Sequence, residues 1–334
     1  MIREPLHTPP IRKFQRAFPI AGRKIGVAIL LLDLCFFLGC DRQVNPAAAA
    51  QLPALEFSDN WGTRGTAPGQ LESPVGIATD GFGDVYIADA DTHSINKFSP
   101  KGGPLLSFSY AALSRPGGIA VDRGGGIYAS NENRILVYWP EGDFLRATHG
   151  GPKVAFRDAA GIAVGDEGDF YVVDRAACRV ESFDWRGKFK KAWGQCGSAI
   201  GEFLAPSGAA VGHDGSVFVA DAGGARVQEF SPDSVFIAAF GQAPSAASGT
   251  PSAPSDVAAV AVSTKDIFAA GGAASPLRVW SLDGAEIPLD PAMLQAAHIT
   301  PDLHVSALAY DVHSGDLLLL DAQACRVLRL HVHL

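Results

Sequence analysis

Residues 76–98 read GIATDGFGDVYIADADTHSINKF, and this stretch decides the fold of the chain. It contains a strand of small residues, a turn at Asp80-Gly81, a strand of β-branched and aromatic residues, a loop opened by Asp89, and a third strand. Its apolar residues do not follow a helical spacing. The stretch therefore predicts three short antiparallel strands.

The same pattern returns along the chain. Close copies begin at Gly118, Gly161 and Gly208, and looser copies begin at Ala259 and Ala307. The repeats are spaced by about 42 to 50 residues, which is the period of propeller blades. The ends of the second strands mark this period at Asp89, Asn131, Asp174, Asp221, Gly271 and Asp321. Six repeats predict six blades.

A fourth strand is expected in each blade, and one of these strands comes from the start of the domain. Trp61-Gly62 ends a predicted strand that has no blade before it, and Trp193-Gly194 and Phe240-Gly241 end fourth strands in the same way. The last repeat has no fourth strand of its own. We therefore expect an all-β, six-bladed β-propeller over residues 55–334, made of four-stranded antiparallel blades and closed by the N-terminal strand.

The first 39 residues differ in kind from the rest. Basic residues precede a short apolar run from Ile25 to Gly39, which is typical of a secretory signal. The run contains Asp33 and is too short for a comfortable membrane span. It ends in Phe37-Leu38-Gly39-Cys40, which resembles the signal of bacterial lipoproteins.

The lipoprotein resemblance implies that Cys40 becomes the lipidated N-terminus. Residues 1–39 would then be a removed signal peptide, and residues 40–54, rich in Pro and Ala, would be a tether. A plain signal peptide and an uncleaved anchor are the alternatives. The expected location is the bacterial cell envelope, with the chain anchored to a membrane and facing the periplasm or the exterior.

The charge of the mature chain argues against nucleic-acid binding. The whole chain has 27 basic and 35 acidic residues; without the six basic and two acidic residues of positions 1–39, 21 and 33 remain, a net charge of −12. A propeller that binds RNA needs a basic face to neutralise phosphates. We expect an envelope protein or a small ligand as the partner, and a monomeric propeller.

The repeats resemble the NHL family of six-bladed β-propellers. That family's consensus runs Pro-x-Gly-Ile-Ala-Val-Asp, then Gly-x-Ile-Tyr-Val-Ala-Asp, then Asn-Arg-Ile and an aromatic residue. Residues 74–98, 116–139, 160–183 and 206–230 match it closely, and residues 257–330 match it loosely. The resemblance implies the fold, whereas the family's functions include scaffolds, lyases and lactonases alike.

The acids at the ends of the second strands are expected to be structural. A residue that repeats in each blade does the same work in each blade, here accepting loop N–H groups and pairing with a nearby Arg. The alternative is a ring of ligand- or metal-facing groups. Aspartates of the first turns, such as Asp80, Asp122 and Asp311, are interpreted as turn residues.

An enzyme is the second hypothesis: a metal-dependent lyase or lactonase with its site at the mouth of the central channel. Amidating lyases of this fold place zinc-binding histidines just before the first-strand glycine. This chain has no histidine there; it has Val75, Gly117, Ala160, Ser207 and Ser306. Lactonase-like propellers hold calcium, and Asn131, Glu132 and Asp174 would resemble such ligands. We expect no catalytic residue, no metal site and no cofactor, with calcium as the alternative.

Three cysteines remain after the signal segment. Cys178 precedes the third strand of blade three and Cys196 follows the fourth, so the hairpin between them brings the two opposite each other. We expect a disulfide there. Cys325 occupies the position of Cys178 in the last blade, where the N-terminal strand offers no partner, and is expected to be a free thiol.

The favoured role is recognition by loops that a rigid ring presents. The face expected to carry it holds the loops after the second and fourth strands, including the low-complexity segment 241–256. That segment is either a neutral insertion or a docking loop. The candidate binding residues are Asp91, His93, Asn131, Glu132, Arg175 and Gln195.

Overall fold

The computed structural model describes residues 54–110, 112–152, 154–241, 257–271 and 276–333. All described residues belong to one compact unit, Ala50–Leu334. The predicted signal peptide, Cys40, the tether up to residue 53 and nearly all of segment 241–256 lie outside the described residues.

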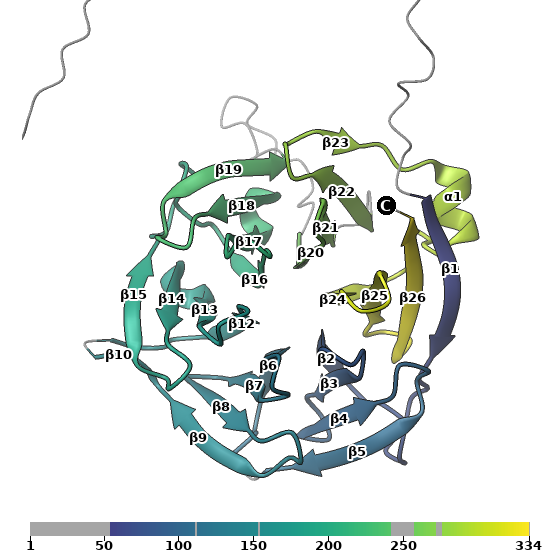
Figure 1. Cartoon of the computed structure of the whole chain (residues 1–334), viewed down its shortest axis with the longest axis horizontal. Helices are drawn as coiled ribbons and strands as arrows, with labels where there is room; N and C mark the ends of the chain where they lie inside the picture. The colour runs from purple at the N-terminus through teal and green to yellow at the C-terminus, as the bar shows by residue number, and fades with distance from the viewer. Residues whose placement is uncertain (1–53, 111, 153, 242–256, 272–275, 334) are drawn as a thin grey trace, which may run out of the picture. The chain divides into compact units, whose positions relative to one another are not determined.

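Six four-stranded antiparallel sheets form a β-propeller, as predicted (Figure 1). In chain order, blade one contains β2 (Pro74–Thr79), β3 (Val85–Asp89), β4 (Ser94–Phe98) and β5 (Pro104–Ser109); blade two β6 (Pro116–Val121), β7 (Ile127–Asn131), β8 (Arg134–Tyr138) and β9 (Phe144–Thr148); blade three β12 (Ala159–Val164), β13 (Phe170–Asp174), β14 (Arg179–Phe183) and β15 (Phe189–Trp193). Blade four contains β16 (Pro206–Val211), β17 (Val217–Asp221), β18 (Arg226–Phe230) and β19 (Phe236–Gly241); blade five β20 (Ala259–Val262), β21 (Asp266–Ala270), β22 (Leu277–Ser281) and β23 (Glu286–Ile287); blade six β24 (Val305–Asp311), β25 (Asp316–Asp321), β26 (Arg326–His333) and β1 (Ala54–Trp61).

The N-terminal strand completes the last blade. β1 runs antiparallel to β26, with Ala54 opposite His333 and Trp61 opposite Val327. Both ends of the propeller therefore lie in one sheet, and the hydrogen bonds between β1 and β26 close the ring. Gly62, which follows this strand, has φ +98°, and Gly194 and Gly241 take φ +93° and +92° after their own strands. The repeated aromatic-Gly ending thus marks the left-handed turn that leaves these three outer strands.

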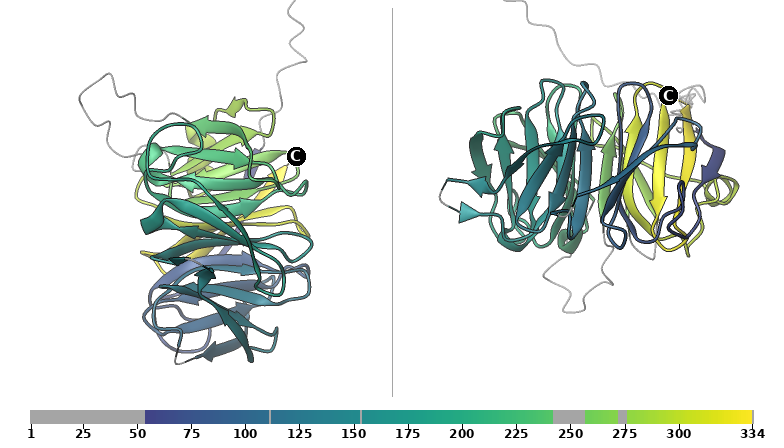
Figure 2. Two further views of the ribbon diagram at one scale, coloured as in Figure 1. Left: turned by 90° about the vertical axis from the view of Figure 1, so that its left-hand side faces the viewer. Right: turned by 90° about the horizontal axis from the view of Figure 1, so that it is seen from below.

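The strand register shows which turns and loops lie at each end of a blade. In blade one, Thr79 pairs with Val85 and Val85 with Phe98, so the turns after the first and third strands lie at one end. We call this end of the six blades the turn face. The loops after the second and fourth strands, residues 90–93 and 62–73 around blade one, lie at the other end, which we call the loop face. Figure 2 (right) shows the sheets side on, with the strands running between the two faces.

The blades bury their second strands from both sides. Every residue of β3, β7, β13, β17 and β21 is buried. Six clusters of side chains, such as the one around Phe170, Phe183 and Phe156, fill the spaces in and between adjacent blades. This double burial explains why the second strands are continuous apolar runs rather than alternating ones.

Glycines in the first strands permit close contact between neighbouring blades at the inner rim. A Cβ on Gly161 would lie 2.6 Å from the Ser207 carbonyl oxygen, and one on Gly118 would lie 2.9 Å from the Ala160 carbonyl oxygen. Small residues in the first strands therefore fit a crowded inner rim.

Short elements lie outside the blade pattern. They are the β10 (Gly150–Gly151) and β11 (Val154–Ala155) pair, the 3-10 turns η2 (Arg175–Ala177) and η3 (Ala222–Gly224), and helix α1 (Pro291–Ala296). Asp290 caps α1 by accepting the Ala292 N–H at 2.8 Å. No helix in the described ranges is long and apolar enough to cross a bilayer.

Candidate functional site

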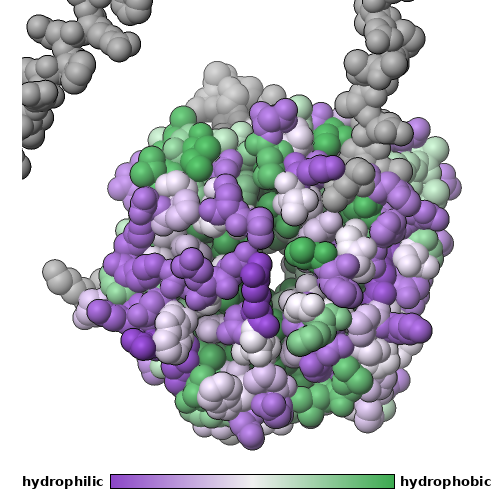
Figure 3. All heavy atoms as spheres, in the orientation of Figure 1, coloured by the Kyte–Doolittle hydropathy of each residue, from purple (hydrophilic) through white to green (hydrophobic). Residues whose placement is uncertain are grey.

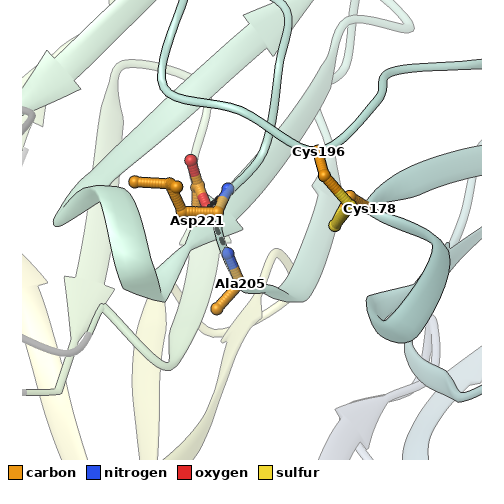
Figure 4. Close-up of a disulfide and its surroundings, with 5 residues drawn as sticks. Cys178, Cys196, Ala205 and Asp221 are labelled. Carbon is orange, nitrogen blue, oxygen red and sulfur yellow. Dashed lines mark hydrogen bonds between the residues drawn. A yellow bond between two sulfur atoms is a disulfide. The ribbon is translucent and has the colours of Figure 1, made fainter.

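The repeated acids at the ends of the second strands anchor the loop face. Asp221 is fully buried, and its Oδ1 accepts the N–H groups of Leu204 and Ala205 at 2.9 Å each (Figure 4). Asp89 and Asp174 bind the N–H groups of their own blades in the same way. These carboxylates satisfy the backbone N–H groups of the chain where it enters the first strand of the same blade.

Arginines from the third strands complete three of these anchors. Arg226 Nε lies 3.1 Å from Asp221, and Arg326 Nε lies 3.1 Å from Asp321. Arg179 Nη2 lies 3.2 Å from Asp174 and also contacts the buried Glu181, and burial raises the pKa of Glu181 despite that contact. The structural interpretation of the repeated acids is therefore confirmed.

Asn131 anchors its loop in the same way through a side-chain amide. Its prediction as a binding residue is therefore corrected. Its Oδ1 accepts the Arg115 N–H and its Nδ2 donates to the Ala112 carbonyl oxygen, both at 2.8 Å. The residue is fully buried. A side chain with both ends bonded inside the fold cannot present itself to a partner, so Asn131 is a loop anchor.

The other five candidates are exposed on the loop face, and their binding role stays a prediction. Asp91, His93 and Glu132 are exposed in loops after second strands. Arg175 Nε lies 3.2 Å from Asp158, and Gln195 donates to Glu202 at 2.7 Å. The Gln195 hydrogen bond, with a second from the Ala199 N–H, lowers the pKa of Glu202. None of these side chains lines the cavity described below.

The structure contains the disulfide between Cys178 and Cys196 (Figure 4). Their Cα atoms are 4.9 Å apart, and the bond ties the start of β14 to the linker that leaves β15. Cys325 is a free thiol buried in blade six, and burial raises its pKa. Its sulfur lies 3.4 Å from the Glu72 carbonyl oxygen, which accepts the S–H.

A cavity of about 610 Å³ runs along the ring axis toward the turn face. All six first strands line it with small or aliphatic residues, for example Ile119, Ala163 and Val211, and their first turns form its mouth. Figure 3 looks down this axis and shows a central opening with hydrophilic side chains beside it. The wall is apolar and the entrance is polar, which is the usual composition of a ligand pocket.

One position of the mouth differs in every blade. The second residue of the first turn is Gly81, Arg123, Asp166, His213, Thr264 or Val312, and all six line the cavity. In blades two, three and four, which are neighbours, ion pairs connect these residues. Arg123 Nη2 lies 2.7 Å and His213 Nδ1 lies 3.2 Å from the same oxygen, Asp166 Oδ2. We call Arg123, Asp166 and His213 the mouth triad.

The neighbouring turn aspartates are structural, as predicted. Asp80 accepts the N–H groups of Phe82 and Asp84 and the hydroxyl of Tyr86, at 2.9 to 3.0 Å. Burial, together with the nearby Asp80, raises the pKa of Tyr86 to about 12 despite the lowering effect of Lys97. Such tyrosines stay protonated at physiological pH and brace the turns.

The mouth triad was missed at the sequence level. Each of its residues looks like an ordinary exposed turn residue. The available signal was the comparison between repeats, because this column carries Arg, Asp and His in three consecutive blades. Among the described residues, no group of three His, Cys, Asp or Glu side chains is placed to hold a metal ion.

Comparisons with known proteins show the fold. No protein-family model matches the chain. Protein brain tumor of Drosophila melanogaster is 25% identical over 173 residues, 49% of this chain, and the match spans only 16% of that protein's length.

Solved structures with the same architecture include a streptogramin B lyase, with a TM-score of 0.55 and 12% identity over 82% of this chain and 98% of the lyase. A catalytically inactive virginiamycin B lyase from Staphylococcus aureus with quinupristin has a TM-score of 0.57 and 13% identity over 84% of this chain and 96% of the lyase. At these identities, the likeness concerns the β-propeller fold alone.

Proposed function

We propose that this chain is an NHL-type propeller that serves as a binding scaffold in the bacterial cell envelope. Acylated Cys40 would hold it on the membrane, and a monomeric ring would bind an envelope protein or a small ligand. The repeat motifs and the partial similarity to protein brain tumor support the family assignment. The short apolar segment that ends at Cys40 supports the location.

The mouth triad is the observation that carries the proposal. The repeated acids are bonded within the fold, whereas Arg123, Asp166 and His213 break the symmetry of the ring at the entrance of its cavity. All three are exposed. A cationic guanidinium and an imidazole beside an apolar channel suit a ligand with a polar end and an apolar body.

The test is crosslinking in native envelopes, with the captured species identified by mass spectrometry. Arg123→Ala, Asp166→Ala and His213→Ala should each reduce capture of the same species at least about tenfold, because hydrogen bonds to charged groups contribute about 1.5–3 kcal/mol. Asp233→Ala is the matched control, since Asp233 is an exposed acid in an outer turn of the same face. Equal capture by all four variants would contradict the proposal.

A lyase is the second candidate, favoured by the pairing of His213 with Asp166. A carboxylate that orients an imidazole is a common arrangement for a general base. The lyases that share the fold make quinupristin a reasonable first substrate. Conversion of quinupristin by the purified chain, lost in His213→Ala, would favour the enzyme. Stoichiometric calcium or zinc in elemental analysis would favour a metal-dependent lyase or lactonase.

A further inference from the structure

The turn face carries one large exposed apolar side chain from each blade. These residues lie in the turns after first or third strands, where the backbone does not require an apolar side chain. They are exposed by 40 to 76% and consist of Phe82, Trp139, Trp185, Val235, Leu282 and Val312. We call them the turn-face anchors. Exposed apolar groups repeated on one face indicate a surface that is covered in use.

The anchors are distributed around the ring rather than gathered in a groove. Phe82 and Val312 lie in inner turns, and the other four lie in outer turns of four different blades. Polar residues separate them: Arg186 lies over the Trp185 ring at 4.4 Å, and Asp233 precedes Val235 by two residues. A single peptide in a groove would reach few of them, whereas a planar surface would reach all six.

The domain begins on the same face. Ala54 pairs with His333, while His331 pairs with Asp316, the residue that follows the first turn of blade six. The segment that precedes the propeller therefore joins it at the turn face. Thirteen residues lie between Cys40 and Ala54, a reach of at most about 50 Å when fully extended.

We propose that the turn face lies on a lipid bilayer, with the turn-face anchors in the interfacial region and the channel mouth opening toward the membrane. Tryptophan and phenylalanine favour this region. An acyl chain on Cys40 would keep the face at a high local concentration near lipid, so weak apolar contacts suffice. The inference rests on the proposed envelope location, and it implies that the mouth triad binds a molecule presented at the membrane surface.

The charge of the domain sets the lipid preference. The mature chain is acidic, so the contact relies on apolar side chains and not on attraction to anionic headgroups. We expect stronger docking on phosphatidylcholine vesicles than on vesicles that contain phosphatidylglycerol, and little loss of docking in high salt.

Quenching of tryptophan fluorescence by brominated phospholipids tests the orientation. The acylated full chain is reconstituted into phosphatidylcholine vesicles with brominated acyl chains. Emission from Trp139 and Trp185 should be quenched, and the Trp139→Leu/Trp185→Leu variant should lose this quenching while keeping apolar side chains at both turns. A tryptophan placed on the loop face by Ile200→Trp in that variant background should stay unquenched.

Three outcomes would overturn the inference. Quenching of the Ile200→Trp reporter alone would place the opposite face on the membrane. Stable association with native membranes but none with phosphatidylcholine vesicles, measured by flotation of a variant without the acylated segment, would indicate a protein partner instead of lipid. Mass spectrometry of the N-terminal peptide separates the two proposals: without an acyl group on Cys40 the proposed location fails as well, whereas an acylated chain with unquenched Trp139 and Trp185 refutes the orientation alone.

Discussion

A glycine near the start of a first strand shows how one residue fixes the distance between two blades. Gly161 faces the Ser207 carbonyl oxygen of the next blade, at 2.6 Å from where a Cβ would lie. Its φ is outside the left-handed region, so the requirement is for space and not for backbone freedom. In blades five and six, Ala259 and Ala307 occupy the equivalent position, so the ring accepts a methyl group where the neighbouring strand leaves room.

Gly161→Ala should therefore destabilise the propeller by about 2 kcal/mol, since the added methyl must separate two packed backbones. Chemical unfolding of the purified protein measures the change in the free energy of unfolding. Gly208→Ala should cost less, because its Cβ would lie 3.3 Å from the Ala258 carbonyl oxygen. Gly81→Ala is the matched control, since nothing lies within 4 Å of its added methyl. A Gly161→Ala protein as stable as the control would refute this account of the inner rim.

Repetition separates structural residues from functional ones, and this part of the residue scale is readable from sequence. Asp89, Asp174 and Asp221 end the second strands of three blades, and each accepts the N–H groups of the two residues that precede the first strand of its blade. Asn131 shows the limit of prediction from repetition. It was expected to be a binding residue, yet its amide anchors the loop as the aspartates do, without an arginine partner. The mouth triad depends on distances across three blades, which no local pattern contains.

At the scale of elements, the hairpin of blade three is extended by its disulfide. Cys178 and Cys196 lie beyond the paired ends of β14 and β15, at a sequence separation of 18 residues. Blade four keeps the same loop without a disulfide, and Ala225 takes the place of Cys178 with the same φ of 51°. The bond therefore adds stability to a conformation that the chain already adopts.

Cys178→Ala/Cys196→Ala should lower the free energy of unfolding by about 3 kcal/mol, from the loop-closure entropy of a loop this short. Unfolding curves with and without reductant provide the measurement. The wild type should lose comparable stability on reduction, and the double variant should be insensitive to reductant. An unchanged midpoint in reduced wild type would show that the crosslink contributes nothing to stability.

Most strands were predictable because each pairs with its sequence neighbour and repeats with a fixed period. Helix α1 and the β10–β11 pair were not, since they lie in connections that do not repeat. A local signal for α1 was present, because Asp290-Pro291 places a capping side chain before proline at the first helical position. Six helical residues between strand predictions are too few for periodicity to reveal.

At the scale of the whole molecule, stability depends on the closure of the ring by β1 and β26. The corner they form repeats the corner of blade three in detail. Gly65 donates to Leu71 and Leu71 to Thr63, both at 3.0 Å, just as Gly197 donates to Phe203 and Phe203 to Gln195 at 3.0 and 2.9 Å. In this correspondence Arg64 takes the position of Cys196, and the free Cys325 takes the position of Cys178.

Arg64→Cys should accordingly form a disulfide with Cys325 and lock the two ends of the propeller together. Cys325 φ is +53° and Cys178 φ is +51°, so the backbone at one partner is already that of the existing bond. The new loop spans nearly the whole ring, and loop-closure entropy predicts a gain of up to about 5 kcal/mol. Thiol titration under denaturing conditions and unfolding curves with and without reductant measure the two effects.

Arg64→Ser is the control, because it also removes the contacts of Arg64 with the carbonyl oxygens of Glu72 and Gln323. Two titratable thiols at positions 64 and 325 under oxidising conditions would show that the corners of blades three and six differ, and that closure by β1 is looser than the shared hydrogen bonds imply.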